Sequence, residues 1–399
     1  MPRTEQPRHF AIFAVPAHGH VNPALGVVAE LAARGHRVTF AVTEQFAPAV
    51  RAAGATPVLY ETTWPTTPEG RAAQWDGDVV QAYTWFLDEA VAVLPQLADA
   101  YEQDRPDVVL YDIGGYPGHV LAHRWGVPAV QLSPTYVAWE GYEQEIAAAM
   151  GEVFASDAYR AYHARFAAWL EQQSVPDAVD DFLGRPHRCL ALIPRALQPN
   201  AERVDADRIT FVGPALGPRD QPGEWSAPDD GRPLLLVSLG SAFTDQPAFF
   251  GACLEAFGGL DWHVVMSIGE HVEAAALGTI PGNVELHRFV PQLAVLERAS
   301  AFVTHAGMGS AKEGLAAGVP MVAVPQAVDQ FGNADRLVEL GVGRRLETAA
   351  SPVELRAAVL ELAADEQVAR RLEALRQEIA REGGAPRAAD LLEGIAREA

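Results

Sequence analysis

Apolar runs and helical patterns alternate along the first third of the chain. The segments between the runs, such as PALGVVAELAARG, repeat apolar residues at helical spacing. The mostly apolar runs are HFAIFAV, HRVTFAV, TPVLY, DVVLYDI and PAVQLS. Such runs are typical of strands buried on both faces, and their alternation with helices predicts a parallel βαβ sheet. Residues 140 to 185 have a helical pattern.

A second series of the same kind occupies the C-terminal half. Its strand candidates, each followed by a helical pattern, are LLLVSLGS, HVVMSI, VELHRF, AFVTHA and PMVAVP. The stretch GPALGPRDQPGEWSAPDDGRP, residues 213–233, separates the two series, lacks periodicity and is dense in Gly and Pro. These properties are typical of a linker between domains.

The chain of 399 residues is too long for one ordinary core and fits two domains of roughly 200 residues each. We expect an α/β protein with an N-terminal domain at 1–212, the linker at 213–233 and a C-terminal domain at 234–375. Residues 376–399 are expected to form helices that pack back on the N-terminal domain. Two doubly wound, Rossmann-like domains would face each other across a cleft, and such sheets bind ligands beyond the carboxyl ends of their strands.

Capping residues indicate where some of the helices begin. In AHGHVNP, Asn22 is the expected N-cap of the first helix and Pro23 its first residue. Ser351 and Glu354 have the spacing of a capping box at the start of the terminal helices. Two glycines at 383–384 indicate a break between those helices.

Charge and composition exclude several classes of partner. The formal net charge of -22 repels nucleic acid and anionic membranes, so neither is an expected partner. Lys312 is the only lysine, and no G-x-x-x-x-G-K motif surrounds it, which argues against a P-loop. Cys189 and Cys253 are too few for a disulfide framework or a thiolate metal site, and they fit a reducing cytoplasm. No stretch approaches the roughly 20 apolar residues of a membrane span, and the first apolar run lacks a signal-peptide cleavage site, so we expect a cytoplasmic protein.

The two histidines of AHGHVNP, His18 and His20, have three interpretations. They could pack at a βα turn, chelate a metal, or transfer a proton. A metal site lacks a third ligand nearby, and we expect none. A base that activates a hydroxyl needs a pKa near neutrality, which suits histidine, and a group that orients it. Asp112, which ends the run DVVLYDI at the same edge of the predicted sheet, could be that group, or it could cap a helix or a turn.

The stretch AFVTHAGMGSAKEGLAAGVP places a glycine-rich turn between a strand and a helix. The turn contains His305, Gly307, Gly309 and Ser310, and the helix contains Glu313. Glycines let backbone N–H groups approach a phosphate, and a helix N-terminus carries about half a positive charge, so a diphosphate could bind here. A purely structural turn is the alternative, since such turns are common in α/β sheets.

A family resemblance connects these motifs. The ordered set FVPQ, HAGMGS with Glu313, GVP and DQFGN resembles the nucleotide-sugar signature of UDP-dependent glycosyltransferases with the GT-B fold. Longer stretches are similar to actinomycete macrolide glycosyltransferases of the oleandomycin-glucosylating type, and the similarity covers essentially the whole chain. These stretches are WGVPAVQLSP, VAWEGYEQE, LVSLGSAFTDQPAF and VPQAVDQFGNAD.

The resemblance implies a set of donor-binding residues. Phe289 would lie at the face of the base, the Val290 backbone and Gln292 at the uracil edge, and Glu313 at the ribose hydroxyls. The diphosphate would contact Ser241, His305, Gly307, Gly309 and Ser310, and the sugar hydroxyls would bind Asp329 and Gln330. Many relatives carry Trp where Phe289 stands. A protonated His305 and fixed dipoles would then stabilise the charge that develops on the diphosphate.

An acceptor site is expected in the N-terminal domain. Tyr and Trp concentrate between Tyr60 and Trp169 and favour a bulky apolar pocket, lined by loops at 61–77 and 133–142. The candidate acceptor residues are Trp75, Ile113, Ser133, Tyr136 and Trp139. The resemblance implies that His20 is the catalytic base and that Asp112 is its partner carboxylate. His18 is our second choice for the base.

The sequence thus predicts an inverting glycosyltransferase that moves a hexose, preferably glucose, from a UDP-sugar to a hydroxyl of a macrolide or similar hydrophobic product. UDP-glucose would be a substrate, with no other cofactor, and antibiotic inactivation would be the biological role. The residues leave the oligomeric state open, with a homodimer among the alternatives. Two other functions are an NAD(P)-dependent oxidoreductase and a non-catalytic UDP-sugar-binding protein; the first lacks a G-x-G-x-x-G motif after the first strand.

Overall fold

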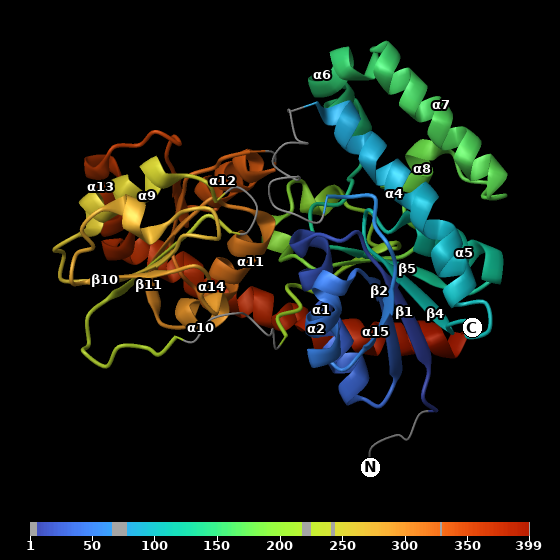
Figure 1. Ribbon diagram of the computed structural model, residues 1–399, viewed down its shortest axis with the longest axis horizontal. Coiled ribbons are helices and arrows are strands. Elements are labelled where there is room, and N and C mark those ends of the chain that lie inside the picture. The colour runs from blue at the N-terminus through green and yellow to red at the C-terminus, as the bar shows by residue number, and fades with distance from the viewer. Residues whose placement is uncertain (1–5, 66–77, 218–224, 241–243, 328, 399) are drawn as a thin grey trace. The chain divides into compact units, whose positions relative to one another are not determined.

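A computed structural model describes residues 6–65, 78–217, 225–240, 244–327 and 329–398 (Figure 1). The chain divides into two compact units. Unit 1 comprises Met1–Ile193, Asn200–Arg219 and Gly383–Ala399, and unit 2 comprises Pro194–Pro199 and Asp220–Glu382. The described part of the chain has no helix that combines the length and the apolar character needed to cross a membrane.

Unit 1 is built on a parallel sheet of seven strands. The strands are β1 (His9–Phe13), β2 (Arg37–Val42), β3 (Thr56–Leu59), β4 (Val108–Tyr111), β5 (Ala129–Ser133), β6 (Cys189–Ala191) and β7 (Ile209–Phe211). Their order in the sheet is β3-β2-β1-β4-β5-β6-β7, and every pairing is parallel. The chain order therefore reverses between β1 and β4, which pair side by side.

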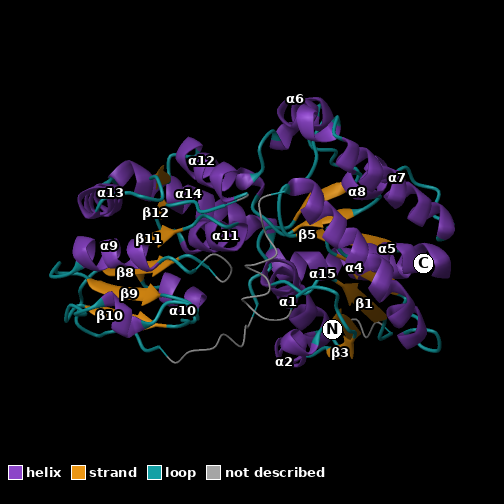
Figure 2. Cartoon of the chain, turned by 45° about the horizontal axis from the view of Figure 1, so that its top comes forward, coloured by secondary structure: helices purple, strands orange, loops and turns teal. Residues whose placement is uncertain are grey.

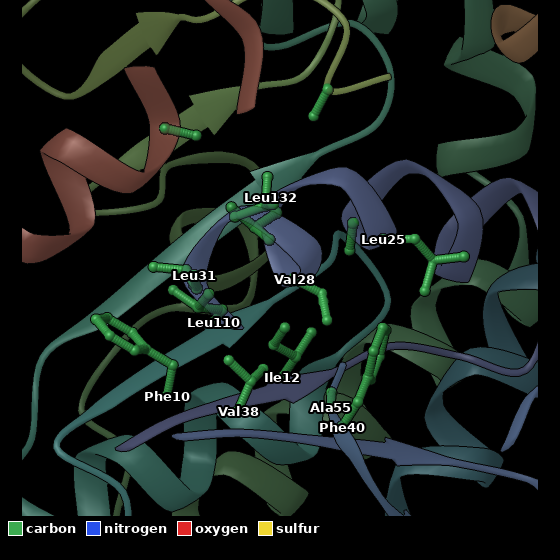
Figure 3. Packing of buried hydrophobic residues seen from close by; sticks show 14 of the residues in the cluster. Phe10, Ile12, Leu25, Val28, Leu31, Val38, Phe40, Ala55, Leu110 and Leu132 are labelled. Atoms are coloured by element: carbon green, nitrogen blue, oxygen red, sulfur yellow. The ribbon is translucent and has the colours of Figure 1, made fainter. Parts of the chain in front are cut away.

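Helices cover both faces of this sheet, because alternate residues of each strand point to opposite sides. The helices of unit 1 are α1 (His18–Ala33), α2 (Ala47–Ala52), α4 (Val79–Ala100), α5 (Tyr116–Trp125), α6 (Tyr142–Phe154), α7 (Asp157–Gln172), α8 (Val179–Gly184) and α15 (Gly384–Glu398), with 3₁₀ turns at η1 (Glu44–Phe46) and η3 (Ala201–Arg203). Phe10 and Ile12 of β1 pack with α1, α2 and α15, as Figure 3 shows for part of this core. Ala11 and Phe13 face the other way, toward α4, α5, α7 and α8.

The expected start of the first helix was wrong. Helix α1 begins at His18, with Ala17 as its N-cap, and the amide of Val21 already donates to the carbonyl of Ala17 at 2.9 Å. Pro23 lies inside the helix and leaves one carbonyl of the first turn without its helical donor. As a result, His20 belongs to the first turn of a helix and not to the preceding loop.

Unit 2 repeats the architecture with six parallel strands (Figure 2). The strands are β8 (Leu234–Ser238), β9 (His263–Ser267), β10 (Val284–His287), β11 (Ala299–Thr304), β12 (Met321–Ala323) and β13 (Gly343–Arg345). The helices are α9 (Pro247–Phe257), α10 (Gln292–Leu296), α11 (Met308–Ala317), α12 (Gln330–Glu339), α13 (Pro352–Ala364) and α14 (Glu366–Glu382), with 3₁₀ turns at η2 (Arg195–Leu197) and η4 (Ala274–Leu277). The strand order is β10-β9-β8-β11-β12-β13, so here the chain order reverses between β8 and β11. The predicted pair of doubly wound α/β sheets is confirmed.

The C-terminal helices follow the predicted punctuation. Ser351 and Glu354 form a complete capping box at the start of α13, and α14 ends at Glu382 directly before the two glycines. Helix α15 then belongs to unit 1, where Ala388 and Leu392 join the core beside α1 (Figure 1). The amide of Gly384 donates to the carbonyl of Val212 at 2.7 Å, which ties the start of α15 to the segment after β7.

Candidate active site

In each sheet, the point where the strand order reverses carries the predicted chemistry. Residues after β1 and β4 lie there in unit 1, and residues after β8 and β11 lie there in unit 2. The loops that follow two such strands diverge to opposite faces of the sheet and leave a crevice for a ligand. We describe the two units separately.

His20 and Asp112 meet at the carboxyl edge of the unit 1 sheet. Nδ1 of His20 donates a hydrogen bond to Oδ2 of Asp112, although the residues are far apart in the sequence. The Asp112 side chain is 4 % exposed and that of His20 is 18 % exposed, so the carboxylate is buried while part of the imidazole is accessible. The amide of Gly114 donates to Oδ1 of Asp112 at 3.1 Å and fixes the carboxylate from the other side. The two side chains that the sequence assigned as base and orienting group are therefore in contact.

The sharp turn after β4 depends on two glycines. A Cβ on Gly115 would lie 2.3 Å from the carbonyl oxygen of Phe13, and a Cβ on Gly114 would lie 2.7 Å from the ring of Phe86. Side chains at either position would push the turn away from β1 and α4. The glycines therefore let Asp112 approach the start of α1, where His20 is located.

The two histidines have different neighbours. The ring of His20 lies 5.9 Å from that of Phe86 on α4, whereas the ring of His18 packs edge-on against Phe46 at 5.0 Å. Among the described residues, no group of three or more His, Cys, Asp or Glu side chains has the arrangement of a metal site. The geometry thus distinguishes His20, with its carboxylate partner, from His18.

The structure describes four of the five candidate acceptor residues. Ile113 follows Asp112 directly and is partly exposed, as are Tyr136 and Trp139 in the segment after β5. Ser133 is fully buried, and its hydroxyl donates to the carbonyl of Thr135 at 2.9 Å, which gives it a role in the turn. The fifth candidate, Trp75, lies outside the described residues.

In unit 2, the residues predicted to bind the nucleoside are clustered. Gln292, at the start of α10, donates through Nε2 to Oε2 of Glu313 on α11 at 2.8 Å and lies 3.4 Å from the hydroxyl of Ser310. Glu313 is 2 % exposed. Phe289 is partly exposed, and the Val290 side chain is buried, immediately before α10.

His305 lies in a space that exists only because two neighbours are glycines. A Cβ on Gly307 would lie 2.3 Å from Nε2 of the ring, and a Cβ on Gly240 would lie 2.6 Å from Cε1. Burial lowers the pKa of His305 to about 4, so the ring is neutral at neutral pH. The expected imidazolium concerns the protein with a diphosphate bound beside this ring, and it stays a prediction.

The glycine-rich turn leads directly into α11. Gly307 is the N-cap of the helix, and a Cβ on Gly309 would meet no atom within 4 Å. The amides of this first turn have no helical acceptors of their own and can bind an anion. Ser241, which was expected to act with them, lies outside the described residues.

Asp329 and Gln330, which are predicted to bind the sugar, form hydrogen bonds with neighbouring residues of the loop and of α12. Oδ2 of Asp329 accepts a hydrogen bond of 2.9 Å from the amide of Asn333, which is fully buried. Oε1 of Gln330 accepts from the backbone amides of Gln326 and Ala327 at 2.7 and 3.1 Å. Since that oxygen closes the loop before α12, only the amide nitrogen of Gln330 can serve a ligand.

Comparisons with known proteins decide the family. The chain is 53% identical over 390 residues to oleandomycin glycosyltransferase from Streptomyces antibioticus, which covers 97% of this chain and 90% of that protein. The chain belongs to the GT-B glycosyltransferases. Residues 252–392 of this glycosyltransferase also match the family described as erythromycin biosynthesis protein CIII-like, C-terminal domain. An NDP-glycosyltransferase of Bacillus licheniformis, YjiC, is 38% identical over 97% of this chain and 98% of its own.

Solved structures agree with this assignment. The glycotransferase of kitacinnamycin superposes with a TM-score of 0.88 at 48% identity, and the match covers 99% of the glycosyltransferase described here and 100% of the solved chain. CalG4, the calicheamicin glycosyltransferase, superposes with a TM-score of 0.84 at 37% identity, with 99% of each chain covered. The resemblance inferred from the motifs is confirmed.

Sequence reasoning missed several residues of this glycosyltransferase that shape the candidate site. Gly240 makes room for His305, and Phe86 borders His20. Gly240 belongs to the SLGS stretch, where a glycine directly after an apolar run was the available signal, and the structure gives it a φ of +76°. Phe86 lies inside an ordinary helical pattern, where nothing in the sequence separates it from packing residues.

Proposed function

We propose that this glycosyltransferase moves a hexose, glucose by preference, from a UDP-sugar to a hydroxyl group of a macrolide or similar hydrophobic acceptor, with inversion at the anomeric carbon. The observation that carries the proposal is the His20–Asp112 pair at the point of strand reversal in unit 1. Such a pair supplies a general base, which a hydroxyl nucleophile requires.

In the proposed step, the acceptor oxygen attacks the anomeric carbon and gives its proton to His20. Nδ1 of the ring is bound to Asp112, which leaves Nε2 to take the proton. The buried carboxylate holds the ring in one tautomer and stabilises the imidazolium that forms. The new carbon–oxygen bond forms as the bond from that carbon to the diphosphate oxygen breaks. A single displacement of this kind inverts the configuration of the sugar.

Unit 2 would bind the donor. With its Nε2 directed to Glu313, Gln292 keeps Oε1 as an acceptor for the N3–H of a uracil base. Glu313 offers carboxylate oxygens to ribose hydroxyls, while Asp329 and the Gln330 amide are assigned to the sugar. The first amides of α11 would hydrogen-bond the diphosphate, whose negative charge grows as the glycosidic bond breaks. This anion would favour the protonated form of His305, which could then donate to it. No cofactor besides the donor is part of the proposal.

The choice of acceptor is supported by the relatives. Those named above include an oleandomycin glycosyltransferase and a calicheamicin glycosyltransferase, and a demethyllactenocin mycarosyltransferase is 34% identical to this chain. A sugar added to a macrolide hydroxyl increases its polar bulk, and we propose antibiotic inactivation as the role. Expression of the chain in sensitive bacteria should then raise the macrolide concentration that stops their growth.

Product analysis tests the reaction itself. Purified protein is incubated with UDP-glucose, UDP-galactose or dTDP-glucose and a panel of macrolides and flavonoids, and products are identified by mass spectrometry. Gain of one hexose, most rapid with UDP-glucose, is the expected result. Binding of UDP-glucose without any product would instead indicate a sugar-nucleotide-binding protein, and stabilisation by NADPH alone would favour an oxidoreductase.

A further inference from the structure

Helix α4 carries a buried carboxylate that the proposed reaction does not use. The Glu89 side chain lies in unit 1 and is only 3 % exposed. It accepts hydrogen bonds from the hydroxyl of Thr62 at 2.7 Å, and from the amide and the hydroxyl of Thr63 at 2.7 and 2.6 Å. Within the described part of the chain it forms no ion pair. Its hydrogen-bond partners among the described residues belong to one short segment after β3.

Burial of a carboxylate has an unfavourable free energy. Removal of an ionised group from water is unfavourable unless hydrogen bonds replace those lost to the solvent, and an apolar side chain would pack in the same volume without that cost. Hydrogen bonds to an ionised acceptor are about twice as strong as neutral ones. The arrangement thus holds residues 62–63 more firmly than an apolar contact would.

The held segment places Trp64 against Phe86. The amide of Trp64 donates to the hydroxyl of Thr62 at 3.0 Å, and its indole N–H donates to the carbonyl of Trp85 at 3.4 Å. The Trp64 ring packs perpendicular to that of Phe86, with 5.1 Å between the ring centres. Both rings are partly exposed.

Phe86 in turn borders both members of the His20–Asp112 pair. Its ring lies 5.9 Å from that of His20. It also packs so closely on Gly114, whose amide holds the Asp112 carboxylate, that a Cβ there would lie 2.7 Å away. Trp64 and Phe86 therefore form a partly exposed aromatic surface next to the proposed base.

We propose that Glu89 is a positioning residue for acceptor binding, which holds Thr62 and Thr63 so that Trp64 and Phe86 present a fixed aromatic surface beside His20. This inference rests on the proposed function, and it identifies an apolar ring face or macrocycle as the part of the acceptor that contacts this surface. Glu89 acts only through these neighbours and takes no part in proton transfer.

The experiment compares Glu89→Ala, Glu89→Gln, Thr63→Val and the double variant with the full-length protein. Asp88→Asn is the matched control, because it removes the neighbouring carboxylate of α4, which pairs with Arg165 at the surface. KM is measured for oleandomycin and for UDP-glucose. Independently of turnover, the rate at which diethyl pyrocarbonate modifies His20 is measured by peptide mass spectrometry, and oleandomycin binding by calorimetry.

Glu89→Ala should raise the KM and the dissociation constant for oleandomycin about tenfold, and leave the KM for UDP-glucose within about twofold. His20 should be modified several times faster, because a loosened Trp64 no longer holds Phe86 in place beside it. Glu89→Gln, which retains an acceptor oxygen, should restore part of the loss, and the effects of Glu89→Ala and Thr63→Val should not add. Asp88→Asn should behave as the unaltered protein.

Two results would overturn the inference. One is unchanged oleandomycin binding and unchanged His20 modification in Glu89→Ala. The other is a loss of stability with an equal fall in kcat for every acceptor and no change in oleandomycin KM, which would assign Glu89 a purely structural role. If the unaltered protein shows no turnover, the proposed function fails, but calorimetry and His20 modification still decide the role of Glu89.

Discussion

The side-chain amide of Gln292 donates a 2.8 Å hydrogen bond to the buried carboxylate of Glu313. A carboxylate can only accept, so it orients the amide with the nitrogen toward Glu313 and the oxygen away from it. The two residues come from different helices, α10 and α11, and the second of these begins at the glycine-rich turn. Within unit 2, the contact thus connects the residue proposed to bind the uracil ring with the helix whose start is proposed to bind the diphosphate.

Gln292→Glu should weaken UDP binding at least about tenfold, because two carboxylates would face each other where an amide now donates. Isothermal titration with UDP measures the change. Gln367→Glu adds the same charge at an exposed position of unit 2 and should bind UDP normally. Full affinity in Gln292→Glu would contradict the assignment of this pair to the nucleoside.

His20→Ala should lower kcat by about 10²–10⁴-fold, the range expected for loss of a general base, while UDP-glucose binding is retained. Turnover assays and calorimetry with UDP-glucose separate the two effects. His18→Ala serves as the comparison, since its ring packs on Phe46 and lies in the same helical turn. Near-normal turnover in His20→Ala, or a larger loss in His18→Ala, would show that the base was assigned to the wrong residue.

Substitution by alanine should have different effects on stability at two glycines of the α11 turn. In Gly307→Ala the new methyl group collides with His305, and the free energy of unfolding should fall by about 1–3 kcal/mol. In Gly309→Ala it meets no protein atom, and the higher helix propensity of alanine should leave stability unchanged or raise it by up to about 1 kcal/mol.

Gly309→Ala should nevertheless bind UDP more weakly, because the methyl group would occupy space that the diphosphate needs. Thermal unfolding and UDP titration of the same samples measure both quantities. A stable Gly309→Ala variant with unchanged UDP affinity would place the diphosphate elsewhere.

The stability of unit 2 should depend on pH through Glu382. Burial raises the pKa of this carboxyl from 4.5 to about 7, although the amide of Arg195 donates to Oε1 at 2.9 Å. Between these two pKa values the unfolded chain is ionised while the folded protein stays protonated, so the contribution of Glu382 to stability falls as pH rises. The full loss in the free energy of unfolding is reached above the folded-state pKa of about 7.

Glu382→Gln should therefore be more stable than the unaltered protein by about 1–2 kcal/mol near pH 8, with allowance for partial exposure, and equally stable near pH 4.5. Urea unfolding at both pH values measures the difference. Glu255→Gln, which replaces an exposed glutamate of α9, is the matched control and should not stabilise the protein at pH 8. An equal gain in stability for Glu382→Gln at both pH values would show that ionisation of Glu382 is not the cause.

Much of the fold could be predicted because its signals are local. The apolar runs of β1 and β11 and the capping box at Ser351 each lie within a few residues, and all appear in the structure. The strands that were missed, β6, β7 and β13, are three residues long. A run of that length has too little pattern to be told from a loop.

The candidate site was predictable only as far as motifs identify residue types. The family motifs pointed to Gln292 and Glu313 but not to the hydrogen bond between them, and they assigned Gln330 to the sugar although its oxygen binds the loop backbone. The motifs also gave no sign of the burial that lowers the pKa of His305 in the protein without ligand, because surrounding residues from other segments cause it.

The sequence by itself determined the alternation of strands and helices, the order of the two domains and the glycines that the turns require, since these follow from local sterics and the periodic burial of apolar residues. Only the tertiary structure decided that His20 meets Asp112, that Phe86 and Trp64 lie beside them, and that Glu89 is buried. Those contacts join segments of separate strands and helices, and their geometry follows from how parallel strands align their ends, a property of the assembled sheet.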